Sequence, residues 1–205
     1  LMQAHVQRTL KIGQSIIRGF ARALDLPDTF FDEAHNPPFY NFRPSYYPPA
    51  KDILKQNLWS CGPHTDYMSM TMLWQDKVGG LQVLNLDGEW IDAPPLDETM
   101  VLNIADMMSI WTNDLFTSNP HRVANRTTDH RLSLAHFIGP GASTNVTCLP
   151  TCMGENNPAR YSSTTTTQHI ANIMSQALDP EIMKKVKLEK QDVTEQLRSA
   201  ERIGG

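Results

Sequence analysis

Two histidines and an aspartate near the middle of the chain have the types and spacing of a metal site. His64 and Asp66 are two residues apart, so their side chains point the same way if the segment is an extended strand. His121 follows the turn-forming sequence Ser-Asn-Pro and is the best candidate for a third ligand. Two imidazoles and one carboxylate on one face of an octahedron leave three positions for other ligands, which is the arrangement of non-haem Fe(II) oxygenases. A structural zinc site, with four protein ligands, leaves none.

His-x-Asp is a weak signal when it stands alone. The chain contains seven histidines and 22 acidic residues, so this spacing also arises by chance. A strand histidine hydrogen-bonded to a neighbouring carboxylate is then the simpler interpretation. The metal hypothesis therefore depends on further motifs.

A second pair with the same spacing, Arg131 and Ser133, could bind a carboxylate. An arginine fork binds carboxylates through two hydrogen bonds, and a serine hydroxyl can donate to the same group. The pair follows His121 by ten residues, so a hairpin could place it beside the metal strand. The alternative is a surface arginine paired with Asp129 or Asp92, and the spacing alone favours neither interpretation.

The elements that would position these residues are short strands. From residue 39 to 150, β-rich runs alternate with clusters of Pro, Gly, Asn and Asp, and no long helical pattern separates them. This spacing predicts an antiparallel sandwich or barrel and argues against βαβ units. The predicted strands are Phe39–Tyr47, Tyr67–Trp74, Leu81–Leu86, Glu89–Asp92, Met100–Ile104, His121–Val123 and Arg131–Ile138.

Helices are expected on either side of this β-rich region. Apolar residues recur at three- and four-residue steps from residue 2 to about residue 25, and Pro27 then ends the pattern. Residues 151–167 are polar and are expected to form a flap or crossover. A helix is predicted over Gln168–Leu178, and a charged segment is expected to be helical from Pro180 to about residue 203.

The composition is that of an ordinary globular protein and argues against some partners. The 205 residues suit one domain, with 40% hydrophobic and 20% charged residues. The formal net charge of −4 argues against a nucleic-acid partner, which would require a basic excess. No apolar run approaches the roughly 20 residues that cross a bilayer, so no membrane partner is expected. Cys61, Cys148 and Cys152 form no paired zinc motif, so we expect reduced thiols in a cytoplasmic protein.

Several separated motifs together resemble one enzyme family. Three of them surround the candidate site residues, namely His64-Thr65-Asp66-Tyr67, His121-Arg122-Val123 and Arg131-Leu132-Ser133. The others are Trp74–Val83, Gly88–Pro95, Leu102–Asp106 and Trp111–Asn113. In this order and spacing, the chain resembles the isopenicillin N synthase-like iron and 2-oxoglutarate-dependent oxygenases over roughly residues 2–140.

The resemblance implies a mainly β fold, the double-stranded β-helix or jelly roll. We expect a backing N-terminal helix, C-terminal helices and a core barrel over about residues 39–150. Family members also carry an N-terminal region around the barrel, whereas this chain begins with Leu1 in a helical pattern. Residues 1–205 are therefore expected to be a catalytic domain that lacks this N-terminal region.

The resemblance also assigns roles to the candidate site residues. His64, Asp66 and His121 match the iron ligands of the family, and they are the expected catalytic centre. Arg131 and Ser133 match the pair that binds the distal carboxylate of 2-oxoglutarate.

Other positions match the family less closely. Tyr47 matches a tyrosine that also reaches the cosubstrate in many members, although Ser45 replaces an asparagine often found two residues earlier. Ala105 replaces a glycine, and we interpret it as a tolerated packing change. Asp106 is a possible alternative carboxylate, but its position matches a structural turn residue.

The activity implied by the resemblance is oxidation of a C–H bond in a small organic substrate, with secondary metabolites as the expected class. Fe(II) is the implied metal, 2-oxoglutarate the cosubstrate and O2 the oxidant, and the coproducts are succinate and CO2. The candidate pocket residues for the substrate are Tyr67, Met68, Trp111 and Phe137. Core filling is the simpler role for the alternating methionines Met68, Met70 and Met72.

Three other functions remain open from the sequence. An iron oxidase that performs oxidative cyclisation without 2-oxoglutarate is one, because such members of the family also keep Arg-x-Ser. A non-catalytic jelly-roll binding module is the second, and stable binding of Fe(II) with 2-oxoglutarate would argue against it. A zinc protein of the lectin or cupin type is the third and fits least well, because three ligands leave the site too open for structural zinc.

Overall fold

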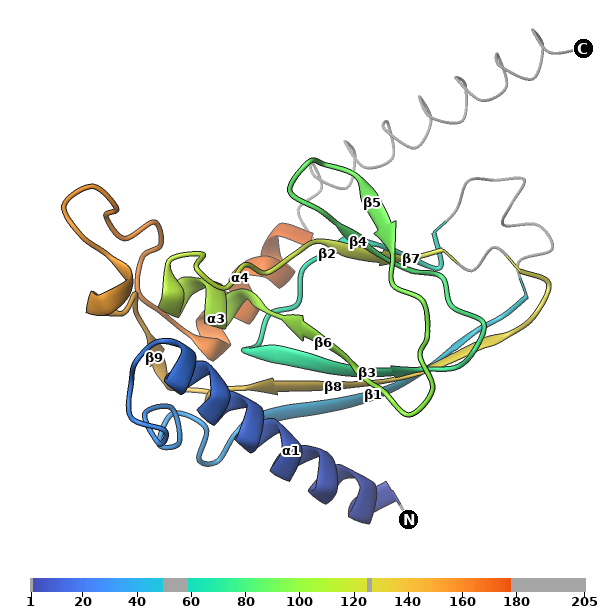
Figure 1. Cartoon of the computed structure of the whole chain (residues 1–205), viewed down its shortest axis with the longest axis horizontal. Helices are drawn as coiled ribbons and strands as arrows, with labels where there is room; N and C mark the ends of the chain where they lie inside the picture. Colours follow the sequence, from blue (N-terminus) through green and yellow to red (C-terminus); the bar gives the residue numbers. More distant parts are fainter. Residues whose placement is uncertain (1, 50–58, 125–126, 178–205) are drawn as a thin grey trace, which may run out of the picture.

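The computed structural model describes residues 2–49, 59–124 and 127–177, and its strands form two facing sheets (Figure 1). Within these residues, the first sheet has four strands in the order β1-β8-β3-β6, and the second has four in the order β2-β7-β4-β5. All pairings in both sheets are antiparallel. Sequence neighbours such as β1 and β2 lie in different sheets, so the chain winds between the layers as a double-stranded β-helix. The predicted fold is confirmed.

All seven strands expected from the sequence are present, but β2, β9 and β10 were not expected and β3 begins three residues after its predicted start. The strands of the first sheet are β1 (Phe39–Tyr47), β3 (Met70–Gln75), β6 (Val101–Ile104) and β8 (Arg131–Gly139). Those of the second are β2 (Cys61–His64), β4 (Leu81–Leu84), β5 (Trp90–Asp92) and β7 (His121–Val123). A short ribbon pairs β9 (Asn145–Val146) with β10 (Thr164–Thr165).

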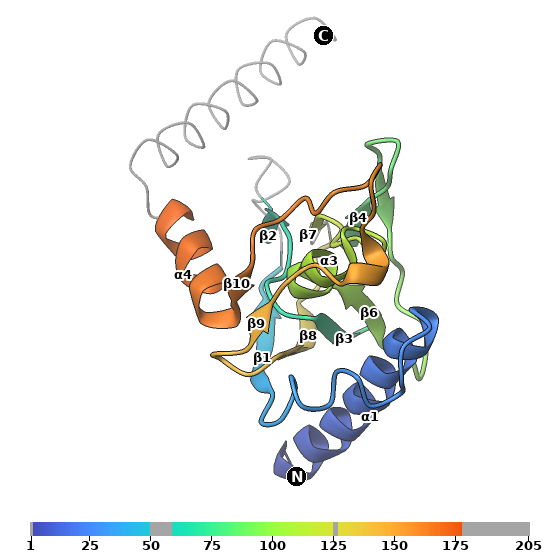
Figure 2. The ribbon, with the colours of Figure 1, turned by 90° about the vertical axis from the view of Figure 1, so that its left-hand side faces the viewer.

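Helix α1 (Met2–Ala23) covers the outer face of the first sheet, away from the second sheet (Figures 1 and 2). Its buried positions include Gly13, Ile17 and Phe20, which recur at three- and four-residue steps. Gly13 permits close packing, because a Cβ there would lie 2.5 Å from the Cδ1 atom of Ile138 on β8. The helix ends two residues earlier than predicted, just before Asp25 adopts a left-handed φ of 56°.

The hydrophobic core lies between α1 and the first sheet, and α3 (Asp106–Thr112) completes it. Met70 and Met72 belong to this core together with Met107 and Met108, all of them buried. Successive strand residues point to opposite faces, so the intervening positions of the same strands face the space between the sheets. One face of the first sheet therefore stabilises the fold, and the other is available for a site.

The structure corrects three local expectations. His64 is the last residue of β2, so Asp66 lies in the following loop and does not share a strand with it. The helix α3 was not expected, because seven residues are too few for a clear helical period. The polar segment after residue 150 is partly ordered, with a 3-10 turn at Pro150–Cys152, the strand β10, and α4 (Thr166–Ala177) beginning two residues before its predicted start.

Some expectations fall on residues outside this description. The charged helix predicted from Pro180 to residue 203 lies outside the described residues. None of the described helices is both long and apolar enough to span a bilayer.

Candidate metal and cosubstrate site

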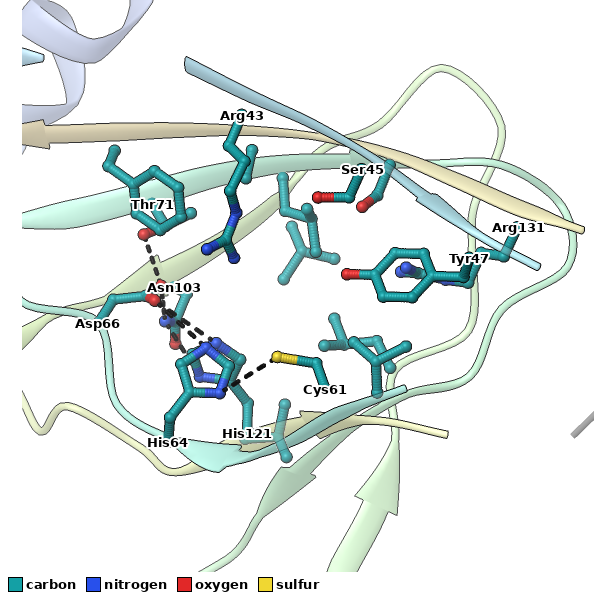
Figure 3. Close-up of a pocket in the computed structure, with 18 residues that line it drawn as sticks. Arg43, Ser45, Tyr47, Cys61, His64, Asp66, Thr71, Asn103, His121 and Arg131 are labelled. Carbon is teal, nitrogen blue, oxygen red and sulfur yellow. Dashed lines mark hydrogen bonds and ion pairs between the residues drawn. The ribbon is translucent and has the colours of Figure 1, made fainter. Parts of the chain in front are cut away.

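A pocket that is open to solvent at its mouth lies between the two sheets (Figure 3). Its charged and metal-ligating side chains come from both layers and from the loop after β2. Between them the walls are mostly apolar. The lining residues that the argument uses are Arg43, Ser45, Tyr47, Cys61, His64, Asp66, Thr71, Asn103, His121, Arg131, Ser133 and Phe137.

His64, Asp66 and His121 meet at one side of this pocket. One potential ligand atom from each lies within 4.8 Å of the other two. The Nε2 atoms of both histidines are 3.7 Å from Asp66 Oδ1. Residues 64 and 121 are directly paired in the register of β2 and β7, which explains how two distant histidines become neighbours. The three side chains could therefore bind one ion from the same side.

Asp66 is held in place by two hydrogen bonds from the first sheet. Thr71 Oγ1 on β3 and Asn103 Nδ2 on β6 both donate to Asp66 Oδ2, over 2.5 and 2.9 Å. Asp66 is only 5% exposed, so these donors replace the solvation that its carboxylate loses. They occupy Oδ2 and leave Oδ1 directed toward the histidines. This outer shell orients the carboxylate as metal ligands are usually oriented.

Backbone carbonyls select the tautomer of both histidines. His64 Nδ1 donates to the Gly62 carbonyl over 2.8 Å, and His121 Nδ1 donates to the Asn119 carbonyl over 3.3 Å. A proton on Nδ1 leaves the Nε2 lone pair available for a metal. Burial lowers the pKa of His121, which favours its neutral form. The pKa of His64 is raised, chiefly by its hydrogen bond with the Cys61 thiol, and metal binding there would have to displace the proton.

Arg131 forms the opposite side of the pocket and is fully buried. Its Nη2 donates to Gln75 Oε1 over 3.1 Å, while Nε and Nη1 are buried without a hydrogen-bond partner among the described residues. Burial lowers the pKa of this guanidinium. A buried arginine fork with unused donors is costly unless a ligand completes it, and a carboxylate has the matching geometry.

Tyr47 and Ser133 lie beside this arginine. The strand register pairs Tyr47 with Arg131 and Ser45 with Ser133, so all four side chains face the same side of the first sheet. The Arg131 guanidinium carbon lies 4.8 Å from the centroid of the Tyr47 ring. The predicted hairpin between the metal strand and this pair is wrong, because β7 and β8 belong to different sheets and face each other across the pocket.

The alternative interpretation, a surface Arg131 paired with Asp129 or Asp92, is wrong, because Arg131 is fully buried and its hydrogen bond is to Gln75. Asp92 accepts a hydrogen bond from Gln82 over 2.8 Å on the second sheet. Asp106, the alternative carboxylate for the metal, lies at the start of α3 outside this pocket, where its Oδ2 is 2.9 Å from His169 Nε2.

The four candidate substrate residues do not share one environment. Phe137 lines the pocket. Trp111 is only 5% exposed and packs against Phe31 at a ring distance of 4.9 Å, in the core behind the first sheet. Met68 is buried against Gly139, and Tyr67 is half-buried and absent from the pocket lining. Of these four, only Phe137 is placed to touch a molecule in this pocket.

Sequence reasoning missed several residues of the site. Thr71, Asn103 and Arg43 line the pocket, and Gln75 accepts a hydrogen bond from Arg131. A signal was present for two of them. Thr71 stands between Met70 and Met72, and Asn103 stands in an apolar strand. A polar side chain in such a strand has to find a buried partner, and here both partners are the Asp66 carboxylate.

Comparisons with known proteins agree with this geometry. Residues 38–140 match the model of the 2OG-Fe(II) oxygenase superfamily. A 2-oxoglutarate-Fe(II) type oxidoreductase, ppzC, from Metarhizium majus is 36% identical over 77% of this chain and 44% of its own. A homoarginine-6-hydroxylase from Glycine max is 39% identical over 74% of this chain and 47% of its own. The chain thus spans less than half the length of these relatives.

Solved structures give the same result. The structure of JOX2 in complex with 2OG, Fe and JA has a TM-score of 0.76 and 29% identity, over 84% of this chain and 51% of that one. A full-length Neurospora crassa protein in complex with alpha-KG and 5-formyluracil has a TM-score of 0.77 and 26% identity, over 83% of this chain and 58% of that one. With its jelly roll, its matching segment and these relatives, the chain belongs to the 2OG-Fe(II) oxygenase superfamily.

Proposed function

We propose that this chain is the catalytic region of an Fe(II)- and 2-oxoglutarate-dependent oxygenase that oxidises a C–H bond of a small organic molecule. One observation carries the proposal. Three ligand atoms within 4.8 Å of one another lie across a single pocket from a fully buried arginine, two of whose donor atoms have no hydrogen-bond partner among the described residues. A molecule with a metal-chelating group at one end and a carboxylate at the other could bind the metal held by these ligands and the buried arginine at the same time.

His64, Asp66 and His121 are the proposed iron ligands, and the residues around them keep them ready to bind. The carbonyls behind the histidines hold the Nδ1 protons, and Thr71 and Asn103 hold the carboxylate. A neutral histidine pair with one carboxylate leaves part of the charge of Fe(II) uncompensated, which favours an anionic chelating cosubstrate.

Arg131, Ser133 and Tyr47 are proposed to bind the distal carboxylate of 2-oxoglutarate. Arg131 supplies the fork, and Ser133 and Tyr47 each present a hydroxyl from a neighbouring strand position. When bound, iron and 2-oxoglutarate reduce O2 and supply the oxidant for the substrate C–H bond, with succinate and CO2 as coproducts. The apolar walls keep water away from this reaction, and Phe137 offers a ring to the substrate.

A small-molecule substrate is supported by the names of the relatives. Besides homoarginine-6-hydroxylase, these include a gibberellin 2-beta-dioxygenase from Phaseolus coccineus that is 36% identical over 58% of this chain. The expectation of a secondary metabolite stays part of the proposal. So does a cytoplasmic location, which is consistent with three cysteines that are all free thiols.

Anaerobic titration with Fe(II) and 2-oxoglutarate tests the proposal. We expect the weak visible charge-transfer band of the chelate to appear only when both are present. Asp66→Ala should abolish it. Arg131→Lys keeps the charge but loses the fork, and it should weaken 2-oxoglutarate binding about tenfold or more.

Two further results would change the conclusion. A wild-type chain that binds Fe(II) but forms no band would contradict the cosubstrate assignment. Substrate oxidation without stoichiometric succinate would support the oxidase that works without 2-oxoglutarate.

A further inference from the structure

Arg43 is a charged pocket residue that the proposed chemistry does not use. The side chains of the pocket lining that are charged at neutral pH, histidines aside, are Arg43, Asp66 and Arg131. Asp66 is assigned to iron and Arg131 to the distal carboxylate of 2-oxoglutarate. Arg43 makes no hydrogen bond or ion pair with any residue in the described part of the chain. Its guanidinium makes a cation–π interaction with Phe137, at 5.2 Å from the ring centroid.

The position of Arg43 relates it to the metal side of the pocket. Arg43, Ser45 and Tyr47 alternate along β1 and face inward, with Tyr47 opposite Arg131 and Arg43 opposite Ala135. Tyr47 follows Arg43 by four positions, which is roughly 13 Å along a strand. Figure 3 shows the Arg43 guanidinium directed toward Asp66 and the two histidines, while Tyr47 and Arg131 lie at the other side. Arg43 is therefore displaced from the distal-carboxylate site.

The charges of the loaded pocket leave Arg43 unbalanced. Asp66 and the two carboxylates of 2-oxoglutarate carry three negative charges, and Fe(II) with Arg131 carries three positive ones. These six charges cancel, so the positive charge of the Arg43 guanidinium has no counter-charge in the loaded pocket. Its residue is exposed at the mouth, where an arriving molecule can reach it without crossing the core. An exposed cation facing a metal site also raises the local concentration of anions.

The apolar lining of the pocket indicates what the rest of a ligand bound to Arg43 must be like. Apolar side chains from both sheets line the pocket that contains Arg43 and the histidines. They are Leu73, Leu81, Val83, Val101, Val123, Ala135 and Phe137. A wholly polar anion would lose solvation against these walls, whereas an apolar body would gain from contact with them.

We propose that Arg43 binds the carboxylate of an amphipathic, monoanionic substrate and so positions its apolar body near the iron. This inference rests on the proposed function and narrows its substrate class to small organic acids. Phe137 holds the guanidinium from one side by stacking, which leaves its fork free for the carboxylate. Arg43 is thus a specificity-determining residue, distinct in role from Arg131.

The test compares acids with their neutral amides in the 205-residue chain. The probes are phenylacetate, 3-phenylpropionate and 4-phenylbutyrate, each paired with its primary amide. Binding is measured by equilibrium dialysis with Mn(II) and saturating 2-oxoglutarate, which requires no turnover. We expect at least one acid to bind the wild-type chain about tenfold more tightly than its amide, as a charge-assisted hydrogen bond would give.

Variants of Arg43 then show whether the preference for the acid comes from the charge of this side chain or from an intact fold. Arg43→Gln should bind that acid and its amide equally, and Arg43→Lys should keep part of the preference for the acid. Arg22→Gln is the matched control, because Arg22 is an exposed arginine on α1 that pairs with Asp28 outside the pocket, and it should keep the full preference. Circular dichroism of each variant verifies its fold.

Three outcomes would overturn the proposal. The wild-type chain could bind no acid more tightly than its amide, or Arg43→Gln could keep the preference. Loss of the Fe(II)–2-oxoglutarate charge-transfer band in Arg43→Gln would instead make Arg43 a cosubstrate residue. A wild-type chain without that band would contradict the proposed function itself, and this result is distinguishable because the dialysis measures the acids directly.

Discussion

At the scale of single residues, the geometry of the candidate metal centre depends on the residues that donate hydrogen bonds to Asp66. The two histidines belong to the second sheet, but the donors to Asp66 belong to the first. Asp66 lies in a loop, so no strand fixes the direction of its carboxylate. Its orientation is therefore set by Thr71 and Asn103, and these two residues should affect metal binding without touching the metal.

Replacing either donor should weaken metal binding. We expect Thr71→Val and Asn103→Leu each to reduce Mn(II) affinity by about 10- to 100-fold, because an unsupported carboxylate is free to rotate away from the ion. Isothermal titration calorimetry measures the affinity directly. Asn156→Leu, at an exposed loop position, is the control and should bind as the wild type does. Unchanged affinity in both variants would show that the loop alone orients Asp66.

At the scale of elements, α1 fixes the first sheet by close packing through a glycine. The Cβ position of Gly13 is 2.5 Å from Ile138 Cδ1 and 3.2 Å from Met70 Cε. Gly19 lies on the same helix, is exposed, and has nothing within 4 Å of its Cβ position. Substitutions at these two glycines therefore distinguish the effect of helix propensity on stability from the effect of packing.

Alanine at these two glycines should have opposite effects on stability. Gly19→Ala should stabilise the fold by up to about 1 kcal/mol, because alanine is the better helix former. Gly13→Ala gains the same propensity but forces Ile138 or the helix to move, and overpacking of this kind costs about 1–3 kcal/mol. Urea unfolding measures both values. Equal stabilisation by both substitutions would mean that the side chain of Ile138 yields without cost.

A buried histidine makes the contact between α1 and the sheet sensitive to pH. His136 on β8 is fully buried, accepts a hydrogen bond from Tyr40 over 2.7 Å and lies 3.1 Å from the Nε2 atom of His5 on α1. Burial, together with the smaller effect of the neighbouring His5, lowers the pKa of His136 to about 4. The folded state therefore holds His136 neutral where the unfolded chain would protonate it.

Stability should fall on acidification through the range set by this histidine. Above its unfolded pKa of about 6.5 it is neutral in both states, and its full contribution is present. Between about pH 6.5 and 4 only the unfolded chain takes up the proton, which costs up to roughly 1.4 kcal/mol for each pH unit. Urea unfolding at pH 7 and pH 5 should give a smaller difference for His136→Gln than for the wild type. An equal difference would assign the acid sensitivity to other groups.

At the scale of the whole molecule, the proposed site connects the two sheets. The histidines come from the second sheet and Arg131 from the first. A metal ion with 2-oxoglutarate would span the space between them, and neither ligand alone reaches both sides. Binding should therefore stabilise the two layers as one unit.

This connection predicts synergy in thermal unfolding. We expect Mn(II) and 2-oxoglutarate together to raise Tm by more than the sum of their separate effects, because the chelate binds the folded state more tightly than either component alone. Differential scanning fluorimetry measures the shifts. The synergy should vanish in Asp66→Ala, and purely additive shifts in the wild type would contradict a shared site.

The sequence by itself was sufficient for the donor types and for most strands. The predicted ranges of β1 and β7 agree with the structure at both ends, because Pro, Gly and Asn clusters mark strand ends locally. The i, i+2 pairing of Arg131 with Ser133 also follows from strand geometry alone. The family motifs directed attention to His64, Asp66 and His121, which the structure brings within 4.8 Å.

Only the tertiary structure decided which face of each strand meets the pocket. Alternation shows that Met70 and Met72 share a face, but the packing of α1 decides that this face is the core and that Thr71 faces the site. Tertiary packing also decided the position of Trp111, which lies in the core on a helix too short to predict. The position of Arg43 likewise depends on a sheet built from distant segments. Local sequence encodes period and turn chemistry, whereas the proximity of residues 43, 66, 121 and 131 arises from long-range strand pairing and layer packing, which no short window of sequence contains.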